Sequence, residues 1–154
     1  MIEKATAEQI YDVALNMRVR DFDEFIATSQ FDTREELASD LARRYGGRDD
    51  VLCVSVDDEP ICIGGAIQTW PGVFTLLLFA TPEFRRIGLE TTRFITRDLF
   101  PGVEAAGGHR IQAVSLDGYS EVHAWLTALG LQREGTLHRF GKNGEDYAQF
   151  ARLI

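Results

Sequence analysis

The sequence predicts a mixed fold in which α-helices alternate with a largely antiparallel β-sheet, in the order βααβββαβαββ. Two pairs of neighbouring strands, at residues 51–69 and 135–153, are each interrupted by a turn signal, which is typical of β-hairpins. Residues 73–80 form a nearly continuous apolar run, as expected of a strand that is buried on both faces of a sheet. Helical patterns separate these strands, and this alternation indicates the mixed class.

The first half of the chain begins with a short strand at residues 2–5, followed by two helices. Thr6 and Gln9 stand three residues apart before an apolar helical pattern, which is the capping-box signature of a helix start. Thr33 and Glu36 repeat this signature and open the second helix. A glycine pair then ends that helix, because glycine readily adopts the backbone conformation that follows a helix C-terminus.

The next two strands, residues 51–56 and 61–69, form the first hairpin. Both arms contain β-branched residues, which favour strands. We expect the turn between them at Asp58–Pro60, since aspartate and proline are common turn residues. Gly64 and Gly65 lie inside the second arm, which predicts a β-bulge or a close backbone contact there.

A segment after the apolar strand combines Pro82, two arginines and a glycine with an amphipathic helix that we expect to end at Pro101. The first turn of a helix leaves backbone N–H groups without partners and carries a positive dipole end. Arg85 and Arg86 can add charge-assisted bonds to phosphate oxygens, and Gly88 lets such a group approach the backbone. The segment therefore predicts a pyrophosphate site. The same pattern is also typical of an ordinary surface helix with solvated arginines.

The last part of the chain contains a buried strand at residues 111–116, a helix at residues 120–129 and a terminal hairpin. The arms of the hairpin are residues 135–140 and 146–153. The pair Asn143–Gly144 is a strong signal for the turn between them, because both residues tolerate a positive φ.

Composition and charge limit the possible functions. The length of 154 residues suits a single domain over residues 1–154. The net charge of −8, from 16 basic and 24 acidic residues, argues against nucleic acid or an acidic membrane as a partner. No apolar run reaches the ~20 residues of a membrane span and no signal peptide begins the chain, so we expect a cytoplasmic protein. Cys53 and Cys62 read as reduced core thiols, and no cysteine or histidine spacing suggests a metal site.

The order of elements and three motifs resemble the GNAT superfamily of N-acyltransferases. The motifs are the hairpin with its glycines at Pro60–Gly65, the stretch Ala80–Glu90 with a P-x-x-R-x-x-G junction, and the stretch Trp125–Gly135. The resemblance implies that the fourth and fifth strands splay apart and that helices cover both faces of the sheet. It also implies that acetyl or another acyl coenzyme A binds with its pyrophosphate at the junction and its pantetheine arm in the gap. Residues 123–135 further resemble a GNAT-like branch carried by tailed podophages, which implies a phage origin.

Carried over residue by residue, the resemblance implies a set of cofactor-binding positions. Arg85 and Gly88 match the arginine and the first glycine of the family's pyrophosphate motif. The backbone N–H groups of Arg86, Ile87 and Gly88 would then donate to the phosphates. Glu90 departs from the family, which prefers glycine or alanine there, and its carboxylate would repel a pyrophosphate. The implied set is Phe79, Ala80, Arg85, Arg86, Ile87, Gly88 and Glu90.

The catalytic positions also depart from the family. Many members use a glutamate on the fourth strand as a base, but residues 74–79 contain no carboxylate. Many members also have an asparagine at the exit of the fifth strand and, seven residues later, a tyrosine that protonates the departing thiolate. These two positions align with Tyr119 and Leu126, so the usual acid is missing. Tyr119 and His123 could move a proton instead, His123 by its intrinsic pKa. The plain alternatives are a helix-surface histidine and a core or loop tyrosine. Asp117 and Glu121, like Tyr119 and His123, come just after the fifth strand, and either could move a proton if it faces the cleft.

Two functions agree with these observations. The first is an acyltransferase that moves the acyl group of acyl coenzyme A to an amine of a small molecule or a protein, with positioning supplying much of the acceleration. The second is a catalytically degenerate interaction protein, encoded by a phage, that binds and modulates enzymes in the host cytoplasm. Glu90 and Leu126 favour this second function. A coenzyme A sensor without turnover lies between them, and both a monomer and a homodimer fit the sequence.

The segment after the first helix contains several acidic residues. Because the corresponding region shapes the acceptor pocket in the GNAT superfamily, these carboxylates would attract a cationic amine if they face that pocket. Otherwise they form a solvated surface. The residues are Asp21, Asp23 and Glu24.

Overall fold

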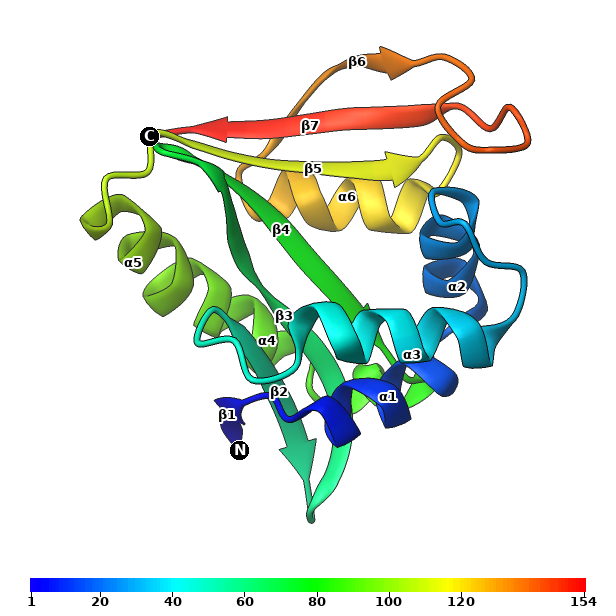
Figure 1. The fold of residues 1–154 in the computed structure, drawn as a ribbon. Coiled ribbons are helices and arrows are strands. Elements are labelled where there is room, and N and C mark those ends of the chain that lie inside the picture. The colour runs from blue at the N-terminus through cyan, green and yellow to red at the C-terminus, as the bar shows by residue number, and fades with distance from the viewer. The chain divides into compact units, whose positions relative to one another are not determined.

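The computed structural model describes all residues from 1 to 154 and shows a mixed set of strands and helices (Figure 1). The strands are β1 (Ile2–Lys4), β2 (Val51–Val56), β3 (Glu59–Trp70), β4 (Val73–Ala80), β5 (Arg110–Leu116), β6 (Gln132–Leu137) and β7 (Tyr147–Leu153). The helices are α1 (Ala7–Leu15), α2 (Val19–Ala27), α3 (Arg34–Tyr45), the 3₁₀ turn η1 (Pro82–Arg86), α4 (Gly88–Phe94), the π turn η2 (Ile95–Leu99), α5 (Phe100–Ala105) and α6 (Ser120–Ala128). None of the helices has the length and apolar character that a bilayer crossing needs.

The strands form one sheet in the order β1-β2-β3-β4-β5-β7-β6. Strands β4 and β5 pair in parallel, whereas β1 with β2, β2 with β3, β5 with β7 and β6 with β7 pair antiparallel. The parallel ladder joins only the first three residues of each strand, Val73–Thr75 to Arg110–Gln112. The predicted mixed fold class is confirmed.

The contacts divide the chain into two compact units. The first unit comprises residues 1–65 and 77–91, and the second comprises residues 66–76 and 92–154. Strands β3 and β4 each contribute residues to both units. The single domain over residues 1–154 stays a prediction.

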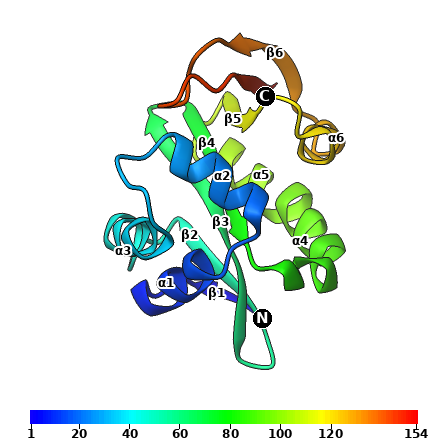
Figure 2. The ribbon, with the colours of Figure 1, turned by 90° about the vertical axis from the view of Figure 1, so that its right-hand side faces the viewer.

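Local capping explains two helices of the first unit. Thr6 Oγ1 accepts the N–H of Gln9 at 3.1 Å, and Gln9 Oε1 accepts the N–H of Thr6 at 3.0 Å, so the predicted capping box is confirmed. Thr33 Oγ1 likewise accepts the N–H of Glu36 at 3.2 Å. Helices α1 and α3 lie side by side (Figure 2). Arg34 joins them, because its Nη1 donates to a carbonyl oxygen at the C-terminal end of α1 at 3.2 Å.

Helix α2 is absent from the order that the sequence predicts. Its N-cap residue, Arg18, makes no capping bond with its side chain, so the local signal of a helix start is missing. Instead, the Arg18 N–H donates to the carbonyl oxygen of Ala80 at 2.8 Å, and Asp21 accepts the N–H of Ala80 at 2.9 Å. The start of this helix is therefore fixed by a partner distant in the sequence.

The first hairpin turns one residue earlier than expected. Asp57 and Asp58 have φ values of 51° and 63°, and Val56 pairs with Glu59 across a two-residue turn. Two successive positive φ values are typical of the type I′ turn that matches the twist of a hairpin. The close backbone contact expected within the second arm is confirmed, because a Cβ added to Gly64 would lie 3.0 Å from the carbonyl oxygen of Leu77.

The helix after β4 continues past Pro101, so its predicted end is wrong. The N–H of Phe100 donates to the carbonyl oxygen of Ile95, five residues earlier, which widens the chain into the π turn η2. Proline lacks an N–H and is tolerated in the first turn of a helix. Pro101 occupies such a position in α5, which runs on to Ala105.

In the second unit, α6 lies along one face of β5 and β7 (Figure 1). Leu126 of α6, Ile111 of β5 and Phe150 of β7 are all buried, and the ring of His123 in α6 lies 5.1 Å from that of Phe150. The expected terminal hairpin is present, but its first arm is β6 at Gln132–Leu137, three residues earlier than predicted. Leu137 pairs with Tyr147, so residues 138–146 connect the arms and the predicted tight turn at Asn143–Gly144 is wrong. Gly144 has a φ of 88°, but the φ of Asn143 is not positive.

Candidate functional site

The segment that follows β4 forms a tight turn and then a helix N-terminus. Pro82 opens the turn η1, in which the N–H of Phe84 donates to the carbonyl oxygen of Thr81 at 3.0 Å. The N–H of Ile87 donates to the carbonyl oxygen of Phe84 at 3.0 Å and closes the turn. Helix α4 begins at the next residue, Gly88.

The backbone donors of this helix lie slightly later than the sequence suggests. The N–H of Thr91 donates to the carbonyl oxygen of Ile87 at 2.8 Å, the first α-helical bond of α4. The N–H groups of Leu89 and Glu90 come before this bond, at the positive end of the helix dipole. Ile87, a predicted donor to phosphate, already uses its N–H within η1. An anion at this end would therefore meet Leu89 and Glu90 rather than Ile87.

Two arginines project from the turn, and an acidic residue accompanies them. Arg85 is highly exposed, with 80% of its side chain accessible. Its Nη2 lies 3.7 Å from one carboxylate oxygen of Glu83, and Nη1 of Arg86 lies 3.5 Å from the other. At such exposure these ion pairs are weak. Both guanidinium groups therefore remain able to bind an anion that displaces Glu83.

Neither the backbone conformation nor the packing at position 88 requires a glycine. The φ of Gly88 is not positive, and an added Cβ would lie 3.6 Å from Cε1 of Phe84, an ordinary van der Waals distance. Gly64, by contrast, is needed to avoid a carbonyl oxygen. A glycine that neither backbone conformation nor packing demands fits a position that a ligand approaches.

Two buried hydroxyl groups at the ends of this segment have no hydrogen-bond partner. They are Oγ1 of Thr81, before η1, and Oγ1 of Thr91, in the first turns of α4. Thr91 is only 5% exposed. A buried hydroxyl without a partner is unfavourable by about 1–3 kcal/mol. The sequence analysis missed both threonines, although their positions beside the junction were a usable signal.

The last two residues of β4, Phe79 and Ala80, already contact other parts of the first unit. Phe79 is fully buried, and its ring packs edge-on against Phe25 with centroids 5.4 Å apart. Both backbone polar groups of Ala80 are bonded, its N–H to Asp21 and its carbonyl oxygen to the N–H of Arg18. A cofactor contact at Ala80 would have to compete with these bonds. The predicted cofactor roles of Phe79 and Ala80 stay predictions.

Glu90 is exposed in the first turn of α4. An acid there interacts favourably with the helix dipole, typically by about 0.3–1 kcal/mol. Its backbone N–H and its carboxylate therefore have opposite effects on an incoming anion. The predicted repulsion of a pyrophosphate by Glu90 stays a prediction.

Tyr119 and His123 lie in the second unit, where β5 passes into α6. Tyr119 is the half-buried N-cap residue of α6. His123 is also half-buried: its Nε2 lies 3.1 Å from the carbonyl oxygen of Leu116, and its ring lies 5.1 Å from that of Phe150. His123 is therefore a half-buried residue of α6 whose ring is held by the end of β5 and by Phe150. The catalytic roles of Tyr119 and His123 stay predictions.

The other candidates near this strand are less available. Leu126 is buried at 4% exposure, so the position of the family's acid belongs to the core. Asp117 pairs with Arg133 at 3.3 Å. Trp125 donates from Nε1 to Thr92 Oγ1 at 3.0 Å, whereas Trp70 is 58% exposed.

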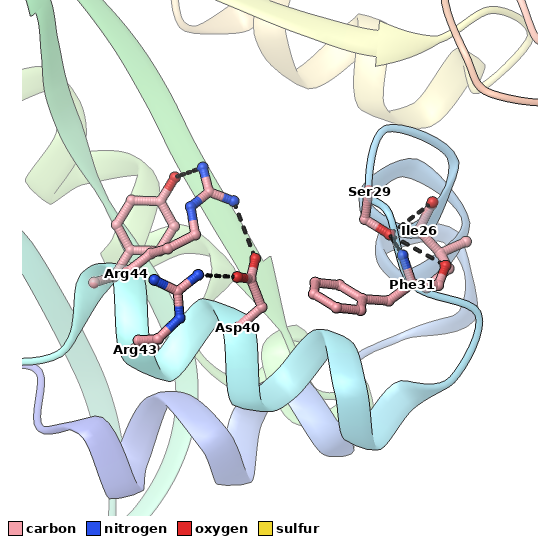
Figure 3. A network of polar contacts seen from close by, with 7 residues as sticks. Ile26, Ser29, Phe31, Asp40, Arg43 and Arg44 are labelled. Carbon is pink, nitrogen blue, oxygen red and sulfur yellow. Dashed lines mark hydrogen bonds and ion pairs between the residues drawn. The ribbon is translucent and has the colours of Figure 1, made fainter.

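Several carboxylates of the first unit are paired with basic residues. In α3, Asp40 accepts from Arg43 at 2.6 Å and from Arg44 at 3.4 Å (Figure 3). Asp21 is buried and paired with Arg18, so it does not present its charge to a cationic amine.

Solved structures share this fold over essentially the whole chain. Ard1 from Thermoplasma volcanium matches with a TM-score of 0.73 and 14% identity, covering 100% of this chain and 97% of that one. Ribosomal-protein-alanine N-acetyltransferase from Brucella melitensis matches with 0.71 and 16%, covering 100% and 99%. A GNAT-family acetyltransferase from Bacillus anthracis matches with 0.73 and 17%, covering 99% and 93%. No family model and no curated protein matches the chain in sequence. At these identities the likeness establishes the fold, which is that of the GNAT acetyltransferases.

Proposed function

We propose that this protein binds acetyl or another acyl coenzyme A and transfers the acyl group to an amine. The observation that carries the proposal is the junction between η1 and α4. There a helix N-terminus and two exposed arginines occur together in a GNAT fold. Gly88 lies between them, at a position where packing does not require glycine. Helix N-termini and arginines are the usual protein partners of phosphate groups.

The residues present fit a pyrophosphate. Arg85 and Arg86 supply positive charge, and the N–H groups of Leu89 and Glu90 supply backbone donors at the helix end. When bound, the coenzyme supplies a thioester whose carbonyl carbon accepts the amine. Phe79, Ala80 and Gly88 complete the proposed cofactor-binding set. Ile87 is left out of it, because its N–H donates to the carbonyl oxygen of Phe84.

Proton transfer is assigned to residues of the second unit. We propose Tyr119 and His123 for this role, because the fourth strand has no carboxylate and Leu126 cannot ionise. The amine is a small molecule or a protein amine, since the similar structures are acetyltransferases and one is named for a ribosomal-protein alanine. The proposed location is the cytoplasm, as a monomer or homodimer.

The second candidate is an interaction protein that keeps the fold without turnover. The observation that favours it is the burial of Leu126 at the position where the family's acid stands. In this case the surface would bind a host protein, as a phage-encoded modulator would. A protein that binds coenzyme A without transferring its acyl group is an intermediate case.

Isothermal titration with acetyl coenzyme A tests the proposal. At a ligand concentration of 100 times the Kd, the free energy of unfolding should rise by about 2.7 kcal/mol. Arg85→Gln should weaken binding. Arg43→Gln, a change of the same charge on an exposed side chain of α3, should not.

No binding by the wild type at millimolar ligand would overturn the acyl-coenzyme A proposal. Binding without release of free thiol in the presence of any amine would favour the sensor. A stable complex in a host lysate, without coenzyme A binding, would favour the interaction protein.

A further inference from the structure

A buried ion pair stands beside the candidate site and has no role in the proposed chemistry. Arg18 Nε lies 2.9 Å from Asp21 Oδ2, and Arg18 Nη2 lies 3.2 Å from Asp21 Oδ1, so the contact is bidentate. The side chains are only 15% and 7% exposed. Asp21 Oδ2 also accepts the N–H of Ala80 at 2.9 Å, and the Arg18 N–H donates to the carbonyl oxygen of Ala80 at 2.8 Å. The pair thus holds both backbone groups of the last residue of β4.

The same arginine reaches into the turn that follows. Its guanidinium carbon lies 4.8 Å from the centroid of the Phe84 ring. Phe84 lies in the middle of η1, and its carbonyl oxygen accepts the N–H of Ile87. Its ring edge would be the nearest group to a Cβ added at Gly88. Arg18 is therefore in contact with Ala80, the last residue of β4, and with Phe84 within η1.

We propose that Arg18 and Asp21 act as positioning residues for the anion-binding turn between β4 and α4. The inference rests on the proposed function for its consequence, which is the affinity for the coenzyme A pyrophosphate. Asp21 and Ala80 fix where the strand ends. Arg18 and Phe84 fix how the turn leaves it, and hence where Arg85, Arg86 and the first N–H groups of α4 stand.

Stability alone is a weak reason for this arrangement. Removing two charges from water is unfavourable, and well-packed apolar side chains of similar size often stabilise a fold as much or more. A bidentate pair adds geometric specificity that apolar contacts lack. Binding sites depend on such support, because groups must be held close to their binding geometry before the ligand arrives.

The test compares Asp21→Asn with the wild type. Asparagine keeps an oxygen that can accept the Ala80 N–H but loses the charge that holds Arg18. The affinity for coenzyme A should fall by roughly tenfold or more, the scale on which outer partners of binding residues act. Arg18→Lys keeps the charge but loses the fork and the contact with the Phe84 ring, and should weaken binding in the same direction.

A control variant separates positioning from stability. Leu41→Ala removes a buried side chain of α3 in the same unit, leaves the Arg18–Asp21 pair unsubstituted, and should lower the Tm strongly. Its affinity for coenzyme A, measured well below its Tm, should equal that of the wild type. An affinity loss in Leu41→Ala equal to that in Asp21→Asn would overturn the inference, as would unchanged affinity in Asp21→Asn.

Hydrogen exchange without ligand keeps the inference separate from the proposed function. In Asp21→Asn the amides of Ile87 and Thr91 should exchange at least tenfold faster, relative to the amides of α3. If the wild type fails to bind coenzyme A but this local loosening is seen, the proposed function fails and the positioning role stands. If binding is seen and the exchange is unchanged, the positioning role fails.

Discussion

The imidazole Nε2 of His123 lies 3.1 Å from the carbonyl oxygen of Leu116. A carbonyl oxygen can only accept, so Nε2 carries the proton and donates it. The lone pair of the neutral ring is then on Nδ1. If His123 acts as a base, it acts through Nδ1, while its Nε2 holds the ring against the end of β5.

Two substitutions of His123 separate these roles. Glutamine can donate to the Leu116 carbonyl with its side-chain amide but cannot take up a proton, whereas alanine loses both functions. If the proton-transfer role holds, His123→Gln and His123→Ala should both lower turnover by roughly a hundredfold or more, with coenzyme A affinity unchanged. Full activity in His123→Gln with a lowered Tm in His123→Ala would make the residue purely structural.

Tyr119 is tested by removal of its hydroxyl alone. Tyr119→Phe keeps the aromatic ring at the N-cap position of α6 and should leave the Tm within a few degrees. If the hydroxyl protonates the departing thiolate, turnover should fall by roughly a hundredfold, and the loss should shrink with a thioester whose thiol is more acidic. An equal loss with every thioester would point to another step.

Glu83 competes with a phosphate for the same two arginines. Glu83→Gln removes this competition and one negative charge, so coenzyme A affinity should rise by about two- to fivefold at low salt, as expected for a charge several ångströms away in a largely aqueous setting. Added salt should reduce the gain because it screens the charge. Glu59→Gln, an exposed carboxylate on β3, is the matched control and should have no effect. Weaker binding by Glu83→Gln would show that the turn needs its ion pairs.

The two cysteines should be unreactive in the folded protein. Both are free and buried, and burial raises the pKa of the Cys62 thiol well above its ordinary value of 9.0. The folded state therefore keeps this proton at a pH where the unfolded chain releases it. The free energy of unfolding should fall as the pH rises above about 9, and this fall should be smaller in Cys62→Ala. Denaturant titrations between pH 8 and 10.5 measure it, and rapid alkylation of the native protein at pH 8 would contradict it.

The elements with local signals were predictable. Thr6 and Thr33 form capping bonds to residues three positions on, so the sequence near each helix start contains the whole cause. Helix α2 has no such signal, because its start depends on bonds between Asp21 and Ala80, 59 residues apart in the chain. The continuation past Pro101 depends on the π turn η2, in which the N–H of Phe100 bonds to the carbonyl oxygen of Ile95. No pattern of residue types in this segment indicates such a turn.

The candidate site divides in the same way. Arg85, Arg86 and Gly88 were predicted because they lie within four positions of one another and their residue types suit phosphate binding. Glu83 was missed although it stands three residues before Arg86, a spacing that favours an ion pair. The hydrogen bond from the N–H of Ala80 could not be predicted, because its acceptor is the side chain of Asp21 on helix α2.

Glu90 provides the sharpest test of where the pyrophosphate lies. Its carboxylate interacts favourably with the N-terminus of α4 by about 0.3–1 kcal/mol, yet it would repel a bound pyrophosphate. Glu90→Gly should therefore lower the Tm, through the lost dipole interaction and the greater backbone freedom of glycine, while it strengthens coenzyme A binding.

The gain in affinity on Glu90→Gly should be larger at low salt, because screening weakens the repulsion that is removed. Glu35→Gly places the same change in the first turn of α3 and should lower the Tm without any effect on affinity. Titrations of both variants at low and high salt give the comparison. If Glu90→Gly leaves the affinity unchanged or weaker at every salt concentration, the carboxylate does not face the phosphates. The pyrophosphate would then have to bind away from the first turn of α4, and the assignment of Leu89 and Glu90 as backbone donors would be wrong.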